Sequence, residues 1–170
     1  QTVLRDFYEF WPEKFFNKTN GVTPRRFMVL ANPGLTDLIC QAIGDDWIRD
    51  LDQLIGLESF AGDAAFRTRW AAVKNQNKVL LADMIHKETG VEVEPASLFD
   101  IQVKRIHEYK RQHLNVLHII SRYLRLKQGL DMDMPARTFI FGGKAAPGYD
   151  LAKRIIRLIN GVAEVINHDP

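Results

Sequence analysis

Residues 98–113 read LFDIQVKRIHEYKRQH, and this stretch decides the fold because an apolar, strand-like run changes abruptly into a cluster of cations. Four basic residues and one carboxylate give residues 104–113 a net charge of +3, whereas the whole chain of 170 residues carries +2. Such a local positive excess in a protein of otherwise balanced charge indicates a built anion site and not a generally basic surface. Phosphate is the first anion to consider.

The same stretch opens the first of two strand-to-helix units. Apolar and polar residues alternate from Phe99 to Val103, which predicts a strand, and from about residue 108 a helical period follows until Gly129. Residues 137–141 predict a second strand, followed by the glycine-rich run GGKAAPGY at 142–149 and a last helix. Two such units predict parallel strands joined by right-handed crossovers in a doubly wound α/β sheet. Two strands are too few for a complete sheet, so we expect part of a longer protein.

Upstream of the strands the pattern is mainly helical. Residues 1–19 are rich in aromatic side chains, which we expect to pack against other surfaces. Asn32–Pro33 is a cap followed by proline, and Asp63 caps a long amphipathic helix that Gly90 ends. We expect the apolar face of that helix to be core, and it comprises Phe66, Trp70, Val73, Leu80, Met84 and Ile85.

Composition narrows the function classes. With 46% hydrophobic and 26% charged residues the chain is an ordinary globular one, and its near-balanced charge gives little support for a nucleic-acid or membrane interaction. Cys40 is the single cysteine, which favours a reducing compartment, either cytoplasm or plastid stroma. The apolar runs are shorter than the ~20 residues of a membrane span. The histidines lack metal-type spacing, so we expect no metal site.

In doubly wound sheets, ligands bind at the carboxyl ends of the strands, where residues 104–110 and 142–149 should meet. Lys104 and Arg105 leave the first strand directly. Lys110 and Arg111 are expected in the first turn of the next helix, where they oppose the helix dipole unless an anion compensates. A solvated charged face, or ion pairs with acidic residues elsewhere in the chain, is the structural alternative.

The glycine-rich loop also has two interpretations. Its backbone amides could approach a phosphate at the following helix N-terminus, or its glycines could serve a tight turn between strand and helix. Tyr149–Asp150 stands where a P-loop needs Lys–Ser or Lys–Thr, which disfavours nucleotide hydrolysis.

Three strings together resemble one family. FDIQVKRIHEYKRQ at 99–112, FFNKTNGVTPRR at 15–26 and GGKAAPGYDLAKRIIRLI at 142–159 resemble, in this order, signatures of the glycogen, starch and maltodextrin phosphorylases. The resemblance covers essentially the whole chain. It implies the two-domain GT-B fold, a homodimer, pyridoxal phosphate as cofactor, and reversible phosphorolysis of α-1,4-glucan to glucose 1-phosphate. Two adjacent phosphates require concentrated positive charge, which accounts for the cations.

The resemblance also assigns individual residues. It implies that Lys104 contacts the cofactor phosphate and that Arg105 and Lys110 hold the substrate phosphate as catalytic residues. Tyr109 would contact the glucosyl 2-hydroxyl, and Asn20 the 6-hydroxyl.

Further implied roles lie around these residues. The matches of His107, Glu108 and Tyr149 line a purine inhibitor site in animal members of the family. Phe27 stands beside the cofactor where the family usually has Trp, so an indole N–H donor is lost while ring packing could remain.

The resemblance divides the chain into a connecting segment (1–30), a helical part (31–97) and the start of the C-terminal Rossmann-like domain (98–170). The family's cofactor lysine lies in an EASGTGNMK-type string, which these residues do not contain, so we expect the fragment alone to be inactive. The alternative from another class is a non-catalytic module that binds sugar phosphate or nucleotide. A basic nucleic-acid-binding domain is disfavoured, because basic residues cluster only at 104–111.

Overall fold

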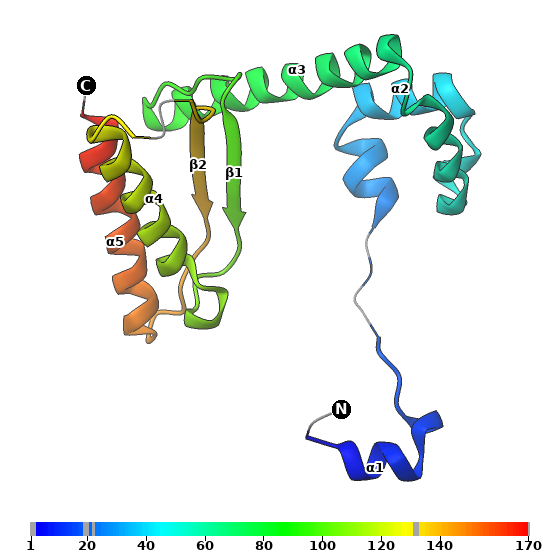
Figure 1. Cartoon of the computed structure of the whole chain (residues 1–170), viewed down its shortest axis with the longest axis horizontal. Helices are drawn as coiled ribbons and strands as arrows, with labels where there is room; N and C mark the ends of the chain where they lie inside the picture. Colours follow the sequence, from blue (N-terminus) through cyan, green and yellow to red (C-terminus); the bar gives the residue numbers. More distant parts are fainter. Residues whose placement is uncertain (1–2, 19–20, 22, 131–132, 170) are drawn as a thin grey trace. The chain divides into compact units, whose positions relative to one another are not determined.

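The structure is a computed structural model that describes residues 3–18, 21, 23–130 and 133–169 (Figure 1). It has two compact units, Gln1–Lys74 and Asn75–Pro170, and helix α3 (Ala64–Thr89) runs from the first into the second. Each unit is described by itself.

Unit 1 is helical, as predicted, and its capping residues act as the sequence indicates. The Asn32 side chain accepts a hydrogen bond from Leu35 N at 3.3 Å, and Gly44 ends the helix with a φ of +82°. Asp63 accepts from the first amides of α3. The elements before α3 are α1 (Arg5–Phe10), η1 (Pro12–Lys14), η2 (Arg25–Leu30), α2 (Pro33–Ile43), η3 (Asp46–Ile48) and η4 (Leu51–Phe60).

The buried side chains of unit 1 are few. Leu38, Ile39 and Trp47 are almost completely buried, and Phe66 joins them at the start of α3. Trp47 Nε1 donates to the half-buried Cys40 Sγ at 3.4 Å. The core of this unit therefore lies around α2 and the turn after it.

The N-terminal aromatic residues do not have the packing that their composition led us to expect. Phe7, Phe10 and Phe16 are all more than half exposed, and α1 and η1 contain no buried residue. Tyr8 and Phe15 do make an edge-to-face ring contact, with centroids 5.6 Å apart. Among the described residues, the aromatic side chains of this segment therefore bury only part of their apolar surface against each other.

The prediction that the apolar face of α3 is core is wrong for three of the six residues, whereas Val73 and Ile85 are half-buried. Phe66 is buried, but Trp70 is 40% exposed, Met84 56% and Leu80 61%. The helix is 26 residues long, and the short elements of each unit cover only part of such a length. Periodicity predicted the helix correctly, but it did not predict which of its apolar side chains are buried by other elements.

Unit 2 contains the two predicted strand-to-helix units. Strands β1 (Leu98–Val103) and β2 (Arg137–Gly142) pair in parallel, with Leu98 opposite Arg137 and Val103 opposite Gly142. A short turn, η5 (Glu108–Lys110), separates β1 from α4 (Gln112–Lys127), and α5 (Asp150–Asn167) follows β2. Helices α4 and α5 lie side by side (Figure 1). The α/β class and the parallel pairing are confirmed.

The core of unit 2 lies beneath the loop that leaves β1. Ile106 is buried against Ala152 and Ile155 of α5. At the opposite end of the two helices, Tyr123 Oη and Lys127 Nζ both donate to the Asp169 carboxylate, at 2.6 and 3.0 Å. Apolar contact therefore joins the loop after β1 to α5, and polar contacts join α4 to the residue that follows the end of α5.

Candidate functional site

The loops that follow the two strands meet at one edge of the sheet, as predicted. Lys104 N donates to Gly142 O at 2.8 Å, and Ile106 N donates to Lys144 O at 3.3 Å. The parallel pairing therefore continues past the ends of β1 and β2. We call residues 104–111 the cation loop.

Gly143 shows why the second loop is rich in glycine. A Cβ at this position would lie 2.2 Å from the carbonyl oxygen of Lys104 and 3.0 Å from its carbonyl carbon. The backbone of the cation loop thus occupies the space that a side chain would need. Of the two interpretations of this loop, the structure favours close backbone packing, and no argument for a phosphate at Gly143 is required.

The cations of this loop have no carboxylate partner within the part of the chain that the structure describes. Lys104 and Arg105 are exposed, and neither they nor Lys110 belong to any of the salt bridges among the described residues. Lys110 Nζ instead lies 5.5 Å from the ring centroid of Tyr109. The structure therefore argues against ion pairs for these cations, and their exposure is compatible both with an anion site and with a solvated charged face.

The expected position of Lys110 and Arg111 in the first turn of α4 is wrong. Lys110 ends the η5 turn, and Arg111 adopts a left-handed conformation with a φ of +55° before α4 begins at Gln112. The turn forms because His107 Nδ1 accepts a hydrogen bond from Tyr109 N at 3.4 Å. These two cations therefore lie outside α4. The expectation that they oppose the helix dipole as first-turn residues does not apply to them.

The three residues assigned to a purine site come together. Tyr149 Oη donates to Glu108 Oε2 at 2.6 Å and accepts from Glu108 N at 3.4 Å. The ring of His107 lies 4.9 Å from that of Tyr149 and 4.4 Å from that of Tyr109. The hydrogen bond to Glu108, with some desolvation, raises the pKa of Tyr149 above 10.0. Glu108 is thus engaged by Tyr149 and not by the neighbouring cations.

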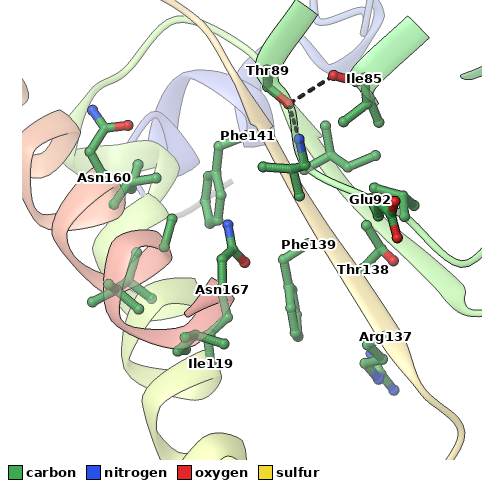
Figure 2. A pocket seen from close by; sticks show the side chains of 18 of the residues that line it. Ile85, Thr89, Glu92, Ile119, Arg137, Thr138, Phe139, Phe141, Asn160 and Asn167 are labelled. Atoms are coloured by element: carbon green, nitrogen blue, oxygen red, sulfur yellow. Dashed lines mark hydrogen bonds between the residues drawn. The ribbon is translucent and has the colours of Figure 1, made fainter. Parts of the chain in front are cut away.

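Among the hollows in the described part of unit 2, two are of similar size. The larger, of about 540 Å³, is mainly apolar, and none of the predicted site residues lines it. Figure 2 shows Phe139 and Phe141 of β2 beside it, with Asn160 and Asn167 of α5. The other is an open hollow of about 490 Å³, and Lys110 is among its lining residues. The cation loop is therefore an exposed surface and not an enclosed cavity within unit 2.

Two classes of site do not occur among the described residues. They contain no group of three or more His, Cys, Asp or Glu side chains arranged to hold a metal ion. None of the helices in the described ranges has the length and apolar character needed to span a bilayer.

Comparison with known proteins identifies the family. The family model for carbohydrate phosphorylases matches residues 1–170, which is the whole chain. The chain belongs to the carbohydrate phosphorylase family. The resemblance carried by the three strings is thereby confirmed.

Individual members of the phosphorylase family are similar along the same residues. The glycogen phosphorylase of Synechocystis sp. is 62% identical over 170 residues, and the muscle form of Homo sapiens is 55% identical over 170. The liver form of Homo sapiens is 53% identical over 168 residues. The chain covers 20% of the length of each of these relatives, so it corresponds to a fragment of a phosphorylase.

Two further residues were assigned by the phosphorylase resemblance. Phe27 belongs to η2 of unit 1 and is 68% exposed. Asn20 lies outside the described residues. Unit 2 therefore brings together Lys104, Arg105, His107, Glu108, Tyr109, Lys110 and Tyr149.

The sequence pattern of this phosphorylase chain did not reveal two amide side chains that contact the cation loop, those of Gln102 and Gln112. Gln112 bonds to the backbone at Arg105 and His107, while Gln102 bonds to the carbonyl of Lys110 and to Asn115. Gln102 interrupts an apolar strand and Gln112 stands among charged residues, so neither position is unusual in the sequence alone. A glutamine in a half-buried strand, which must find hydrogen-bond partners, is the one signal that was available.

Proposed function

We propose that this chain is part of a pyridoxal-phosphate-dependent α-1,4-glucan phosphorylase. Such an enzyme transfers the terminal glucosyl unit of a glucan to inorganic phosphate and releases glucose 1-phosphate. The observation that carries the proposal is the cation loop, whose four cations, Lys104, Arg105, Lys110 and Arg111, have no carboxylate partner among the described residues, in a chain of the phosphorylase family. The relatives' name, glycogen phosphorylase, supports the same substrate class.

The residues of the cation loop fit phosphate chemistry. Lysine is a compact charge that binds phosphate from several directions, and the arginine guanidinium binds it through two parallel hydrogen bonds. We assign Arg105 and Lys110 to the substrate phosphate and Lys104 to the phosphate of the cofactor. Pyridoxal phosphate, when bound, would supply a phosphate group beside that of the substrate. The three cations would then neutralise the charge of both groups, which favours binding and stabilises charge that develops during transfer.

The sugar would be held by neutral groups. Tyr109 is 70% exposed at the end of the cation loop, and we assign its hydroxyl to the 2-hydroxyl of the glucosyl unit. Asn20 is assigned to the 6-hydroxyl, and Phe27 to ring packing beside the cofactor. A hydroxyl and an amide can orient a sugar without competing for the phosphate.

We assign His107, Glu108 and Tyr149 to a purine site, by analogy with animal members. The rings of His107 and Tyr149, 4.9 Å apart, offer aromatic surface, and Glu108 offers a hydrogen-bond acceptor. Adenine should then inhibit the enzyme, and Tyr149→Ala should abolish that inhibition. Equal inhibition of parent and variant would contradict the assignment.

The whole enzyme would be a cytoplasmic or plastid homodimer of the GT-B fold. Residues 1–30 would connect from the cleft, 31–97 would form the helical part, and 98–170 would begin the C-terminal Rossmann-like domain. A non-catalytic module for sugar phosphate or nucleotide is the alternative. The two differ in one measurable property, because only the enzyme consumes inorganic phosphate in the presence of glucan.

The test uses a hybrid enzyme, in which these 170 residues replace the matching segment of the Synechocystis glycogen phosphorylase. Arg105→Ala or Lys110→Ala should lower kcat/KM for phosphate by about 10–100-fold, the worth of one hydrogen bond to a charged group. The KM for glucan should change far less. Arg157→Ala, which removes an exposed cation from α5, is the matched control. Unchanged phosphate kinetics in both variants, or a hybrid without phosphorolysis, would refute the proposal.

A further inference from the structure

We propose that Gln112 is a positioning residue that holds the main chain of the cation loop so that Arg105 can bind phosphate. The inference rests on the proposed function. Gln112 is the first residue of α4, and its relative exposure is 0%. Its Nε2 donates to Arg105 O at 3.2 Å, and its Oε1 accepts from His107 N at 3.4 Å. One side chain thus joins the loop on both sides of Ile106.

A buried carboxamide needs partners for both its oxygen and its nitrogen. Both hydrogen-bond partners of the Gln112 side chain are backbone groups of the cation loop, so its burial fixes that backbone. Ile106, between the two bonded residues, is 5% exposed and packs against α5. Two hydrogen bonds and one buried side chain therefore hold three consecutive residues of the loop.

The two neighbours of Arg105 are also bonded to the last residue of β2 and to the loop that follows it. Lys104 N donates to Gly142 O, and Ile106 N donates to Lys144 O. Backbone groups on both sides of the Arg105 Cα are thus bonded, while the side chains of Lys104 and Arg105 are exposed and have no salt bridge among the described residues. A fixed backbone with a free cationic side chain reduces the ordering cost that phosphate binding would otherwise carry.

A second glutamine, Gln102, bonds to the backbone of Lys110, the other residue assigned to the substrate phosphate. Gln102 Nε2 donates to Lys110 O at 3.1 Å, and Gln102 Oε1 accepts from Asn115 Nδ2 at 3.0 Å. The carbonyls of both Arg105 and Lys110 are thus held by a glutamine, one from α4 and one from β1. This repetition favours positioning of the loop over a role of Gln112 in the stability of α4 alone.

The test is Gln112→Met in the hybrid enzyme. Methionine fills a similar volume but leaves the Arg105 carbonyl and the His107 amide without their partner. We expect kcat/KM for phosphate to fall by about 10–100-fold, the range for a loss of exact placement. The KM for glucan should stay within about twofold of the parent, because Gln112 bonds to the backbone of Arg105 and His107 and not to Tyr109, the residue of this loop assigned to the sugar. Gln128→Met, at the exposed C-terminal end of α4, is the matched control and should leave both unchanged.

If Gln112→Met does not fold, Gln112→Asn replaces it. Asparagine keeps the carboxamide but is one methylene too short to reach both backbone groups, so a smaller loss, again confined to phosphate, is expected. Equal losses for phosphate and glucan in the folded variant, or unchanged kinetics, would overturn the inference while an active parent leaves the proposed function intact. A parent without phosphorolysis would overturn both.

Discussion

Replacing Gly143 with alanine is the sharpest perturbation of the contact between the two loops. The added Cβ would lie 2.2 Å from Lys104 O, whereas ordinary van der Waals contact begins at 3.4 Å. The deficit is therefore about 1 Å. The clashing atoms belong to backbone and cannot rotate away, so the cation loop must move relative to β2.

The size of the effect follows from this displacement. Overpacking of a well-packed region costs about 1–3 kcal/mol in free energy of unfolding. The displaced carbonyl belongs to the residue just before Arg105, and a misplacement of about 1 Å can cost on the order of 100-fold in rate. Gly143→Ala should therefore reduce kcat/KM for phosphate by one to two orders of magnitude, an effect on placement and not on charge.

The measurement is steady-state kinetics with phosphate as the varied substrate, together with the thermal midpoint of the hybrid enzyme. Gly148→Ala is the control, because a Cβ at that position meets nothing within 4 Å and its φ lies outside the left-handed region. It belongs to the same loop and undergoes the same substitution. If both variants showed the same phosphate kinetics and the same thermal midpoint, the close approach at Gly143 would not control the cation loop.

Three further predictions concern stability. Tyr149→Phe removes the donor to Glu108, so hydrogen exchange of the backbone amides in the cation loop should accelerate. Because the pKa of Tyr149 is raised in the folded protein, the difference in protection between parent and variant should be constant below pH 10.0 and should vanish as the pH rises through the raised pKa. Asp169→Asn should accelerate hydrogen exchange of the backbone amides at the end of α5. The hydrogen bond from Tyr123 lowers the pKa of Asp169, so the difference in protection between parent and variant should persist above pH 3.8 and should vanish as the pH falls through the lowered pKa. Trp47→Ala, at 1% exposure, should destabilise unit 1 by about 3–5 kcal/mol in chemical unfolding, and a loss below 1 kcal/mol would contradict its place in the core.

Local signals predicted the elements of the fold well. Asn32 and Asp63 start their helices as expected, and Gly129, with a φ of +72°, follows the end of α4. These features depend on a few neighbouring residues, and their chemistry is therefore visible in a short window of sequence. The parallel pairing of β1 and β2 followed from the order of elements, because a helix between two strands of one sheet favours that arrangement.

Features that depend on distant contacts were not predictable. Arg111 has a φ of +55° although it is not glycine, and this delays the start of α4. The exposure of Leu80 and Met84 on α3 depends on which elements are present to cover them. The need for glycine at Gly143 arises from a carbonyl 39 positions away in sequence, at Lys104. Each of these is decided by tertiary packing, which propensity and periodicity do not encode.

In the cation loop, neutral groups hold the backbone while the charged side chains form no ion pairs among the described residues. Like charges so close in sequence repel each other, and ion pairs would relieve that repulsion but would also occupy the side chains that we propose for phosphate binding. The structure instead fixes the loop with neutral hydrogen bonds, from Gln102, from Gln112 and from the backbone of the loop after β2. Salt screens charges at an exposed surface over about 8–10 Å but has little effect on part-buried hydrogen bonds between neutral groups. Raised ionic strength should therefore weaken the binding of phosphate while leaving the backbone of the loop in place.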